Sequence, residues 1–338
     1  MYRIGIAGFG FMGQCHCRAY REVSKARVTA VFDSDPRTFE KPPTQGNIAA
    51  GELGDLKGAA KFTDFERFLA DDLDVIDICA PTYLHRELTE MALRSGRAVI
   101  CEKPMALSVA DCDAMIEASR QCKRPLMVAQ CVRFWPGYDV ILEAVRSGKY
   151  GRCLSATFRR IGGAPAWSGW FLKASLSGGG ILDCLVHDFD LARAAFGTPS
   201  EIAARGTADA LGTGSGISYC RADLHYPVGP ESVTIEGGWV IGQAFPFSMS
   251  AFVQFEQATL AFGIEPGAAL AIYHQNGRKE VPALKPGQGY EWELRYFLDC
   301  LAANDSPGRC PPAESRDAIA MAVAARDSIA AGVPVPVG

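Results

Sequence analysis

Hydrophobic residues in the first third of the chain form short apolar runs separated by amphipathic segments. The apolar runs cover residues 2–7, 28–32, 75–80, 98–101 and 126–130. Helical patterns cover residues 12–23, 63–69, 85–96 and 108–122. Residues 41–58 are rich in Gly, Pro and Ala and follow neither pattern, so we expect a loop or a poorly formed helix there. Strands that alternate with helices predict a doubly wound parallel sheet, which is an α/β fold.

The hydrophobic pattern changes after one more helical segment at residues 138–147. Period-two alternation, typical of strands, covers residues 156–160, 201–207, 218–226, 232–240, 247–256, 259–263 and 269–274. Short turns such as Asn276-Gly277 join these segments, and this predicts a largely antiparallel open sheet. Helical patterns return at residues 291–303 and 313–331, so the second half is expected to be an α+β domain.

A glycine-rich turn follows the first predicted strand directly. Residues 8–13 read Gly-Phe-Gly-Phe-Met-Gly, which is the G-x-G-x-x-G pattern of a dinucleotide-binding turn. Gly8 allows the tight turn, Gly10 allows the backbone to approach a pyrophosphate, and Gly13 allows close packing of the helix on the strand. Phe11 and Met12 lie at the start of that helix, whose free N–H groups and dipole favour phosphate.

The second predicted strand ends in an acid that favours one dinucleotide. Asp33 lies twenty residues after Gly13, where a carboxylate can accept hydrogen bonds from the adenosine ribose. The same carboxylate repels a 2′-phosphate, so NAD is expected, while Ser34 and Arg37 leave NADP open. We therefore expect an NAD(P)-binding Rossmann domain in residues 1–122 and an α+β domain for substrate binding and oligomerisation in residues 123–338.

Composition excludes several classes of protein. The 338 residues are 48% hydrophobic, with a formal charge of −4 and a pI of about 5.8, and they contain no basic run. Nucleic acids and anionic membranes are therefore not expected partners. The first strand meets the glycine turn within eight residues, which leaves no room for an export signal, and no apolar run reaches the ~20 residues of a membrane span. A cytoplasmic location is expected.

The twelve cysteines do not predict a metal site. They include no C-x-x-C pair, and the one cluster, Cys15-His16-Cys17, has adjacent side chains that point apart on a helix. Reduced thiols are therefore expected, and no metal ligands are predicted.

Glu102-Lys103-Pro104 follows a buried strand, so Lys103 is expected at the carboxyl edge of the parallel sheet. Ligands bind at that edge in open α/β sheets, and a bound nicotinamide ring would lie there. The alternative is a surface loop lysine without a function. Glu102 can also be structural.

A second candidate group lies between the two halves of the chain. Residues 177–190 read Ser-Gly-Gly-Gly-Ile-Leu-Asp-Cys-Leu-Val-His-Asp-Phe-Asp. Asp183 and His187 are four residues apart, which would place an imidazole beside a carboxylate on one helix face. The preceding glycines are expected to admit a ligand, although an isolated pair of this kind is more often a surface contact. Leucine and phenylalanine at helical spacing predict a buried stripe on the same helix.

These motifs together resemble the Gfo/Idh/MocA oxidoreductases, which include glucose-fructose oxidoreductase and inositol dehydrogenase. The matching pieces are the turn at residues 8–13 with His16, the acid Asp33, Ala80-Pro81-Thr82 with His85, Glu102-Lys103-Pro104, and residues 178–187. The resemblance covers residues 2–197 and implies that Lys103, Asp183 and His187 are the catalytic trio. It also implies cofactor contacts at Pro81, Thr82, His85, Glu102 and Lys103. Leu185 departs from the family, which often has glycine there.

The chemistry expected of the trio follows from alcohol oxidation. A secondary alcohol that loses hydride to NAD must also lose its hydroxyl proton, and His187 is the expected base. Asp183 would hold its tautomer, and Lys103 would stabilise negative charge on the reacting oxygen. Lys103 could itself be the base if burial lowered its pKa.

Substrate contacts are expected near the junction of the two halves. Arg133, Trp135 and Trp170 lie there, and sugar sites use arginine and aromatic faces, although aromatic residues are more often part of a core.

The expected activity is NAD-dependent oxidation of a secondary hydroxyl in a cyclic polyol, sugar or sugar derivative. Two alternatives stay open at this point, a non-catalytic nucleotide sensor or co-repressor and a glycosidase that oxidises its sugar transiently with NAD. An exposed apolar sheet face would aggregate, so a homodimer or homotetramer through the second sheet is expected.

Overall fold

The computed structural model describes residues 1–40, 56, 58–165 and 168–338, and these form two compact units. The first unit comprises Met1–Cys131 and Gln288–Arg316, and the second comprises Val132–Gly287 and Asp317–Gly338. The boundary expected between residues 122 and 123 lies before the last strand of the first unit, and the expected loop at residues 41–58 falls almost entirely outside the described residues.

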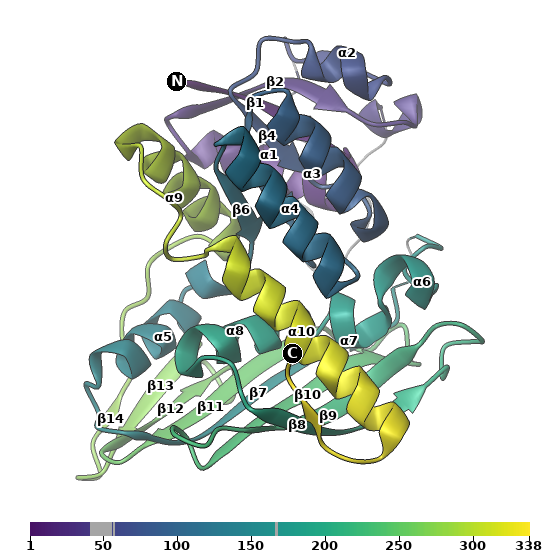
Figure 1. Cartoon of the computed structure of the whole chain (residues 1–338). Coiled ribbons are helices and arrows are strands. Elements are labelled where there is room, and N and C mark those ends of the chain that lie inside the picture. The colour runs from purple at the N-terminus through teal and green to yellow at the C-terminus, as the bar shows by residue number, and fades with distance from the viewer. Residues whose placement is uncertain (41–55, 57, 166–167) are drawn as a thin grey trace. The chain divides into compact units, whose positions relative to one another are not determined.

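A six-stranded parallel sheet forms the centre of the first unit, in the order β3-β2-β1-β4-β5-β6 (Figure 1). The strands are β1 (Tyr2–Ala7), β2 (Ala26–Phe32), β3 (Ala60–Phe62), β4 (Val75–Ile78), β5 (Ala98–Glu102) and β6 (Leu126–Ala129). The expected doubly wound fold is confirmed, and β3 is an additional strand. Every residue of β4 and β5 is buried, because a parallel sheet is covered on both faces.

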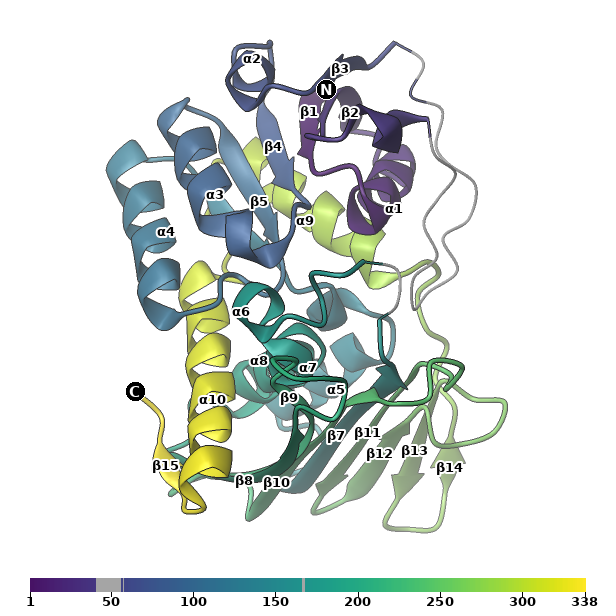
Figure 2. The same cartoon turned by 90° about the vertical axis from the view of Figure 1, so that its right-hand side faces the viewer.

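Helices cover both faces of this sheet (Figure 2). They are α1 (Phe11–Ala19), α2 (Phe65–Leu69), α3 (His85–Arg94), α4 (Val109–Cys122) and α9 (Gly289–Ala303), with 3₁₀ turns at η1 (Tyr20–Glu22), η2 (Pro36–Phe39) and η3 (Thr82–Leu84). Helices α3 and α4 contact each other on one face, and α1 contacts α9 on the other. The order of the strands reverses between β1 and β4, because β2 and β3 lie on one side of β1 and β4 to β6 lie on the other; doubly wound folds bind ligands at this switch point.

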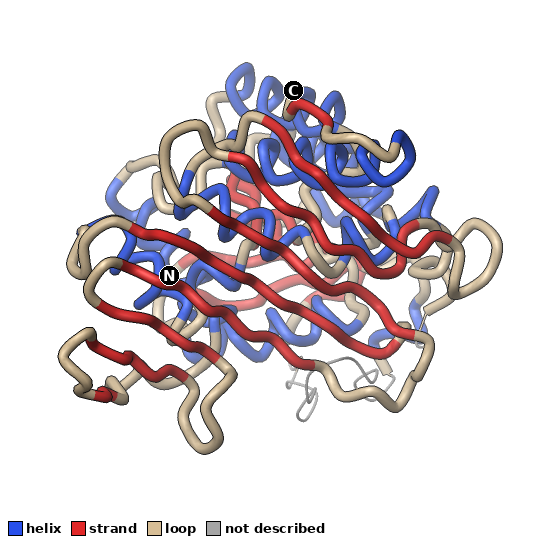
Figure 3. Tube along the Cα trace, turned by 90° about the horizontal axis from the view of Figure 1, so that it is seen from below, coloured by secondary structure: helices blue, strands red, loops and turns tan. Residues whose placement is uncertain are grey.

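The second unit is built on a nine-stranded sheet in the order β14-β13-β12-β11-β7-β10-β9-β8-β15 (Figure 3). Its strands are β7 (Cys153–Gly163), β8 (Glu201–Ala208), β9 (Ile217–His225), β10 (Ser232–Val240), β11 (Ser248–Phe255), β12 (Ala258–Phe262), β13 (Leu270–His274), β14 (Lys279–Glu280) and β15 (Val335–Pro336). Only the neighbours β7 and β10 run parallel, so the expected largely antiparallel sheet is confirmed.

Helices cover one face of the nine-stranded sheet and leave the other face open (Figures 1 and 3). Apart from α9, the helical elements that follow β6 are η4 (Cys131–Phe134), α5 (Tyr138–Ser147), α6 (Ala174–Ser177), α7 (Gly179–Asp183), α8 (Val186–Phe196) and α10 (Pro312–Ala331). Positions that alternate along β7 and β11, such as Phe158 and Val253, are buried under these helices.

The open face is not the apolar surface that the sequence predicts. Exposed positions along its strands include Arg159, Arg221, Asp223 and Gln254, and its large exposed aromatic residue on β11 is Phe252. The expectation of an apolar outer face is therefore wrong, because these strands alternate buried apolar with exposed polar residues. Among the described residues, none of the helices is both long and apolar enough to cross a bilayer.

Candidate active site in and around the parallel sheet

The glycine turn is shaped for two different purposes. Gly8 has φ +92°, and a Cβ there would lie 2.6 Å from the Ala80 nitrogen, while a Cβ on Gly13 would lie 2.0 Å from the Gly8 oxygen. These two glycines are therefore required for folding. A Cβ on Gly10 would meet no atom within 4 Å, so its lack of a side chain serves no internal packing. It leaves open the space at the start of α1 that a pyrophosphate would take.

Asp33 lies directly after β2 and connects that strand to the glycine turn. Its Oδ2 accepts a hydrogen bond from the Phe9 N–H at 2.8 Å, and its Oδ1 accepts one from the Asp35 N–H at 2.9 Å. Each carboxylate oxygen can accept a second bond, so Asp33 can still receive ribose hydroxyl groups. The exposed Arg37 donates to both carboxylate oxygens of Asp35, at 2.8 and 2.9 Å. This pairing engages two of the five N–H donors of the guanidinium that could have received a 2′-phosphate.

The segment after β4 is fixed by a buried histidine. Pro81 precedes the η3 turn, Thr82 is buried, and His85 is the first residue of α3 with 1% exposure. The His85 Nδ1 lies 2.8 Å from the Pro104 oxygen, and its Nε2 lies 2.8 Å from the Ala80 oxygen. Burial lowers the pKa of His85, although both carbonyl oxygens favour a proton on the ring. The ring thus links the end of β4 to the segment after β5, and a contact with nicotinamide remains a prediction.

Lys103 directly follows β5, at the carboxyl edge of the parallel sheet. Its side chain is half-buried, and its peptide bond to Pro104 is cis. The Lys103 backbone N–H donates to Oε2 of Glu102 at 3.0 Å. The other oxygen of Glu102, Oε1, lies 2.9 Å from Nε2 of His16 in α1.

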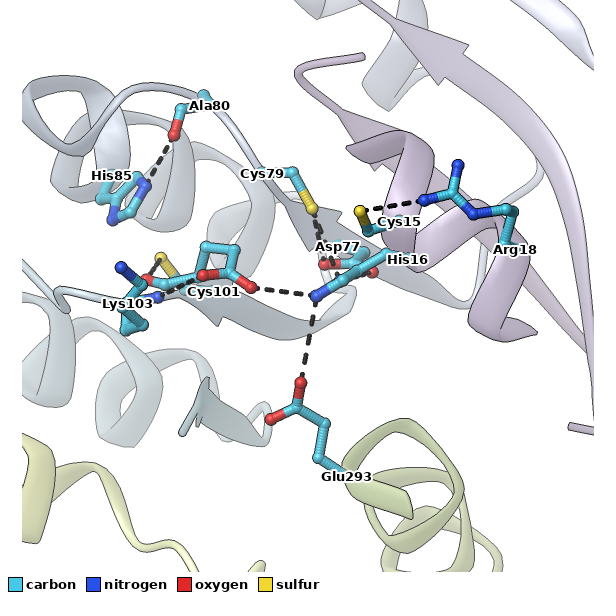
Figure 4. Close-up of polar contacts among 11 residues, drawn as sticks. Cys15, His16, Arg18, Asp77, Cys79, Ala80, His85, Cys101, Lys103 and Glu293 are labelled. Atoms are coloured by element: carbon cyan, nitrogen blue, oxygen red, sulfur yellow. Dashed lines mark hydrogen bonds and ion pairs between the residues drawn. The ribbon is translucent and has the colours of Figure 1, made fainter. Parts of the chain in front are cut away.

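His16 is the centre of a buried group of ionisable side chains (Figure 4). Its Nδ1 lies 2.8 Å from Oδ2 of Asp77 in β4 and 3.5 Å from the sulfur of Cys79, and its Nε2 lies 3.9 Å from Oε1 of Glu293 in α9. His16, Asp77 and Glu293 are all 0% exposed, and Glu102 is 4% exposed. We call His16, Asp77, Cys79, Glu102 and Glu293 the His16 cluster.

Burial and charge determine the protonation of this cluster. Burial is the largest single effect and opposes a charge on His16, but Asp77 and Cys79 together outweigh it, so the pKa of His16 lies well above its usual value. Burial raises the pKa of Glu293 well above its usual value, and His16 offsets only part of that shift. Burial likewise raises the pKa of the Cys79 thiol. The two shifts favour an imidazolium at His16 and a protonated carboxyl group at Glu293.

The sequence does not indicate most of this cluster. His16 belongs to the motif after the glycine turn, but Asp77 and Glu293 are not among the predicted site residues. An acid inside the otherwise apolar β4 was the available signal for Asp77, because a buried charge requires a partner. No local signal exists for Glu293, since α9 lies almost two hundred residues after Glu102 in the chain.

The segment with Asp183 and His187 differs from the expected continuous helix. Helix α7 ends at Asp183, Cys184 and Leu185 form a turn, and α8 begins at Val186. The glycines before Asp183 also serve a different purpose from the one expected. A Cβ on Gly180 would lie 2.2 Å from the Ser218 oxygen, so glycine here allows α7 to lie against β9.

Two buried ion pairs anchor α8, the helix with His187. Asp188 accepts from Nε and Nη2 of Arg160 in β7 at 2.8 and 3.2 Å. Asp190 accepts from Nε and Nη2 of Arg133 at 2.6 and 2.7 Å. Bidentate pairs of this kind fix both position and orientation. The Arg133 pairing accounts for its burial, and a substrate contact by Arg133 remains a prediction.

The other predicted site residues lie in the second unit. Trp135 and Trp170 are partly exposed, and Trp170 stacks on Phe171 with ring centroids 4.0 Å apart. Trp167 lies outside the described residues. Leu185, the departure from the family pattern, is fully buried. Lys103 belongs to the first unit and Asp183 and His187 to the second, so their meeting at one site remains a prediction.

Comparison with known proteins identifies the family. Residues 2–130 match the oxidoreductase family with an NAD-binding Rossmann fold, and residues 138–255 match the GFO/IDH/MocA C-terminal domain. The chain belongs to the Gfo/Idh/MocA oxidoreductase family. It is thus an oxidoreductase with NAD as its cofactor, and Gly10 and Asp33 fit that cofactor in the geometry described above.

Named relatives within the Gfo/Idh/MocA family act on sugars and polyols. The chain is 25% identical to D-apiose dehydrogenase from Paraburkholderia graminis over 90% of its own length and 82% of that protein's. It is 31% identical to inositol 2-dehydrogenase from Rhizobium meliloti, over 56% of its own length and 54% of that protein's. A solved oxidoreductase from Agrobacterium radiobacter, in complex with NAD⁺, L-tartaric acid and magnesium, shares the fold with a TM-score of 0.83 at 22% identity, over 100% of this chain and 98% of that one.

Proposed function

We propose that this Gfo/Idh/MocA protein is a dehydrogenase that transfers a hydride between NAD and a secondary hydroxyl carbon of a cyclic polyol, sugar or sugar derivative. One observation carries the proposal. The open space at Gly10 and the amine of Lys103 both belong to the first unit, at the carboxyl ends of β1 and β5. A dinucleotide on the glycine turn would extend along this edge, where its nicotinamide can meet a substrate beside Lys103. The names of the relatives support the substrate class.

Each residue of the trio has a role that the chemistry requires. The bound cofactor supplies the hydride acceptor. His187 accepts the proton of the substrate hydroxyl, and Asp183 orients its ring. Lys103 donates a hydrogen bond to the reacting oxygen and stabilises the negative charge that develops on it. The two ion pairs of α8 favour this assignment, because a general base must be held at a fixed position.

The test is turnover with a panel of inositols, aldoses and sugar acids, followed as absorbance of NADH. Lys103→Met and His187→Ala are expected to lower kcat by a factor of about 10² to 10⁴, while the Kd for NADH stays within about threefold. His225→Ala is the matched control, since His225 is an exposed residue of β9. NADH binding with no turnover on any carbohydrate would instead indicate a sensor. Release of an aglycone without net NADH would indicate a glycosidase.

We also propose that the chain is cytoplasmic and forms a homodimer or homotetramer through the open face of the nine-stranded sheet. None of the twelve cysteines, all of which are described residues, forms a disulfide bond, which is typical of a reducing compartment. A broad open sheet presents Phe252 among polar groups, and protein interfaces combine apolar anchors with a polar surround. Light scattering that finds only a monomer at micromolar concentration would contradict the oligomer.

A further inference from the structure

We propose that His16 is a positioning residue for Lys103, acting through the carboxylate of Glu102. The inference rests on the proposed function, in which the Lys103 amine contacts the reacting oxygen. It assigns to the first helix a part in catalysis that is separate from cofactor binding.

The contacts form a continuous path from α1 to Lys103. His16 Nε2 lies 2.9 Å from Glu102 Oε1, and Glu102 Oε2 accepts the Lys103 backbone N–H at 3.0 Å. The Glu102 carboxylate therefore joins the imidazole to the backbone of Lys103. Both residues of the contact are almost completely buried, so water does not compete for it.

His16 is itself held rigidly. Its Nδ1 is hydrogen-bonded to Asp77 at 2.8 Å, and its Nε2 lies 2.9 Å from Glu102 Oε1 as an ion pair. The raised pKa of His16 favours the imidazolium that this ion pair requires. The hydrogen bond to the Asp77 carboxylate is charge-assisted and orients the ring. One oxygen of Glu102 thus lies beside the imidazole, and the other accepts the Lys103 N–H.

The residue after Lys103 is held from the other side. The Pro104 oxygen lies 2.8 Å from Nδ1 of His85. Lys103 is thus the middle residue of a segment whose two neighbours are both anchored to buried histidines. Such anchoring matters because catalytic groups must be held within ~0.5 Å of their productive position.

Glu293 provides a comparison inside the same cluster. Its Oε1 lies 3.9 Å from His16 Nε2, the residue is completely buried, and burial raises its pKa, which favours the protonated form. Glu293→Gln keeps the shape of a protonated carboxyl group, and we expect it to lower kcat at least tenfold less than His16→Asn does, because Glu293 lies outside the path from His16 through Glu102 to the Lys103 N–H.

Two substitutions of His16 separate positioning from folding. An asparagine amide can replace the Nδ1 donor and keep the Asp77 contact, whereas a glutamine amide reaches the Nε2 position and keeps the Glu102 contact. We expect His16→Asn to lower kcat about 10²-fold with the Kd for NADH unchanged within about threefold, because a shift of about 1 Å in a catalytic group costs that much. His16→Gln should recover at least tenfold of that loss. Glu102→Gln, which lacks the charge, should lower kcat in the same way and decides the question if His16→Asn does not fold.

Several outcomes would overturn the inference. One is a His16→Asn or Glu102→Gln enzyme with kcat within threefold of wild type. Another is a parallel loss of kcat, NADH affinity and melting temperature in both His16 variants, which indicates a role in folding alone. A third is a purified protein that contains one metal ion per chain and loses it in Glu293→Gln, because His16 would then be a neutral metal ligand and not an imidazolium. If Lys103→Met retains turnover, the proposed function fails instead; if Lys103→Met is inactive while His16→Asn is active, only the inference about His16 fails.

Discussion

At the scale of single residues, the three glycines of the turn at residues 8–13 differ in the space around the position that a Cβ would take. Gly13 approaches the Gly8 carbonyl so closely that any side chain must displace backbone, whereas the position of a Cβ on Gly10 is empty. The sequence motif predicts that Gly13 allows close packing and that Gly10 allows the approach of a pyrophosphate. The geometry shows that Gly13 is required by the fold, and it leaves the cofactor as the proposed reason for Gly10.

A pair of alanine substitutions tests this division. Gly13→Ala should lower the free energy of unfolding by about 3 kcal/mol or more, because its Cβ overlaps with a carbonyl oxygen. Gly10→Ala should leave stability unchanged or slightly higher, since φ −73° suits alanine, but should raise the Kd for NAD by a factor of about ten or more. Urea unfolding and NADH fluorescence titration measure the two effects. Equal losses of stability in both variants would refute the separate roles.

At the scale of elements, local patterns predict most of the strands and helices. The five strand segments expected in the first unit correspond to β1, β2, β4, β5 and β6, because apolar runs flanked by turns are strong local signals. The break between α7 and α8 was not predicted, since helical spacing continues through Cys184 and Leu185 and both retain right-handed helical dihedrals. Helix α7 also packs closely on β9 at Gly180. This contact joins segments almost forty residues apart, so local spacing does not predict it.

Local patterns also do not identify the partners of buried charges. Asp188 follows His187 directly and Asp190 lies three residues after His187, and acids on an apolar helix indicate that each requires a cation. The pattern does not indicate which arginines supply it. Arg160 comes from β7 and Arg133 from η4, whereas the sequence alone predicts a substrate contact for Arg133. Arg133 is 2% exposed and forms a bidentate ion pair with Asp190, so its observed contact is one that stabilises the fold.

At the scale of the whole molecule, the chain returns to the first unit after β14, and β15 completes the nine-stranded sheet only later in the chain. Residues 288–316 add α9 to the Rossmann unit, and the expected division into two consecutive domains does not include this return. Sequence periodicity identifies α9 as a helix but contains no information about its partner. Glu293 is the consequence, because α9 places a third carboxyl group beside His16 and closes the buried cluster.

The pH dependence of unfolding tests the burial of Glu293 beside His16. Burial raises the folded-state pKa of Glu293, so its stabilising contribution is complete below the unfolded-state pKa and is lost as pH rises through the folded-state pKa. Glu293→Gln should thus match wild type near pH 4.5 and become more stable than wild type above it, by at most about 1.4 kcal/mol per pH unit until the folded-state pKa is passed. His16, Asp77, Glu102 and Tyr290 face this group and are the same in both proteins, so the difference between the two unfolding curves isolates Glu293.

Urea unfolding of both proteins at pH 5 and pH 8 measures the effect. A difference that is absent at pH 8 would mean that Glu293 is ionised in the folded protein. The cluster would then contain three carboxylates for one imidazolium, and the charge on His16 could not be assigned to Glu102. The same measurement therefore tests both the return of α9 and the protonation on which the role of His16 depends.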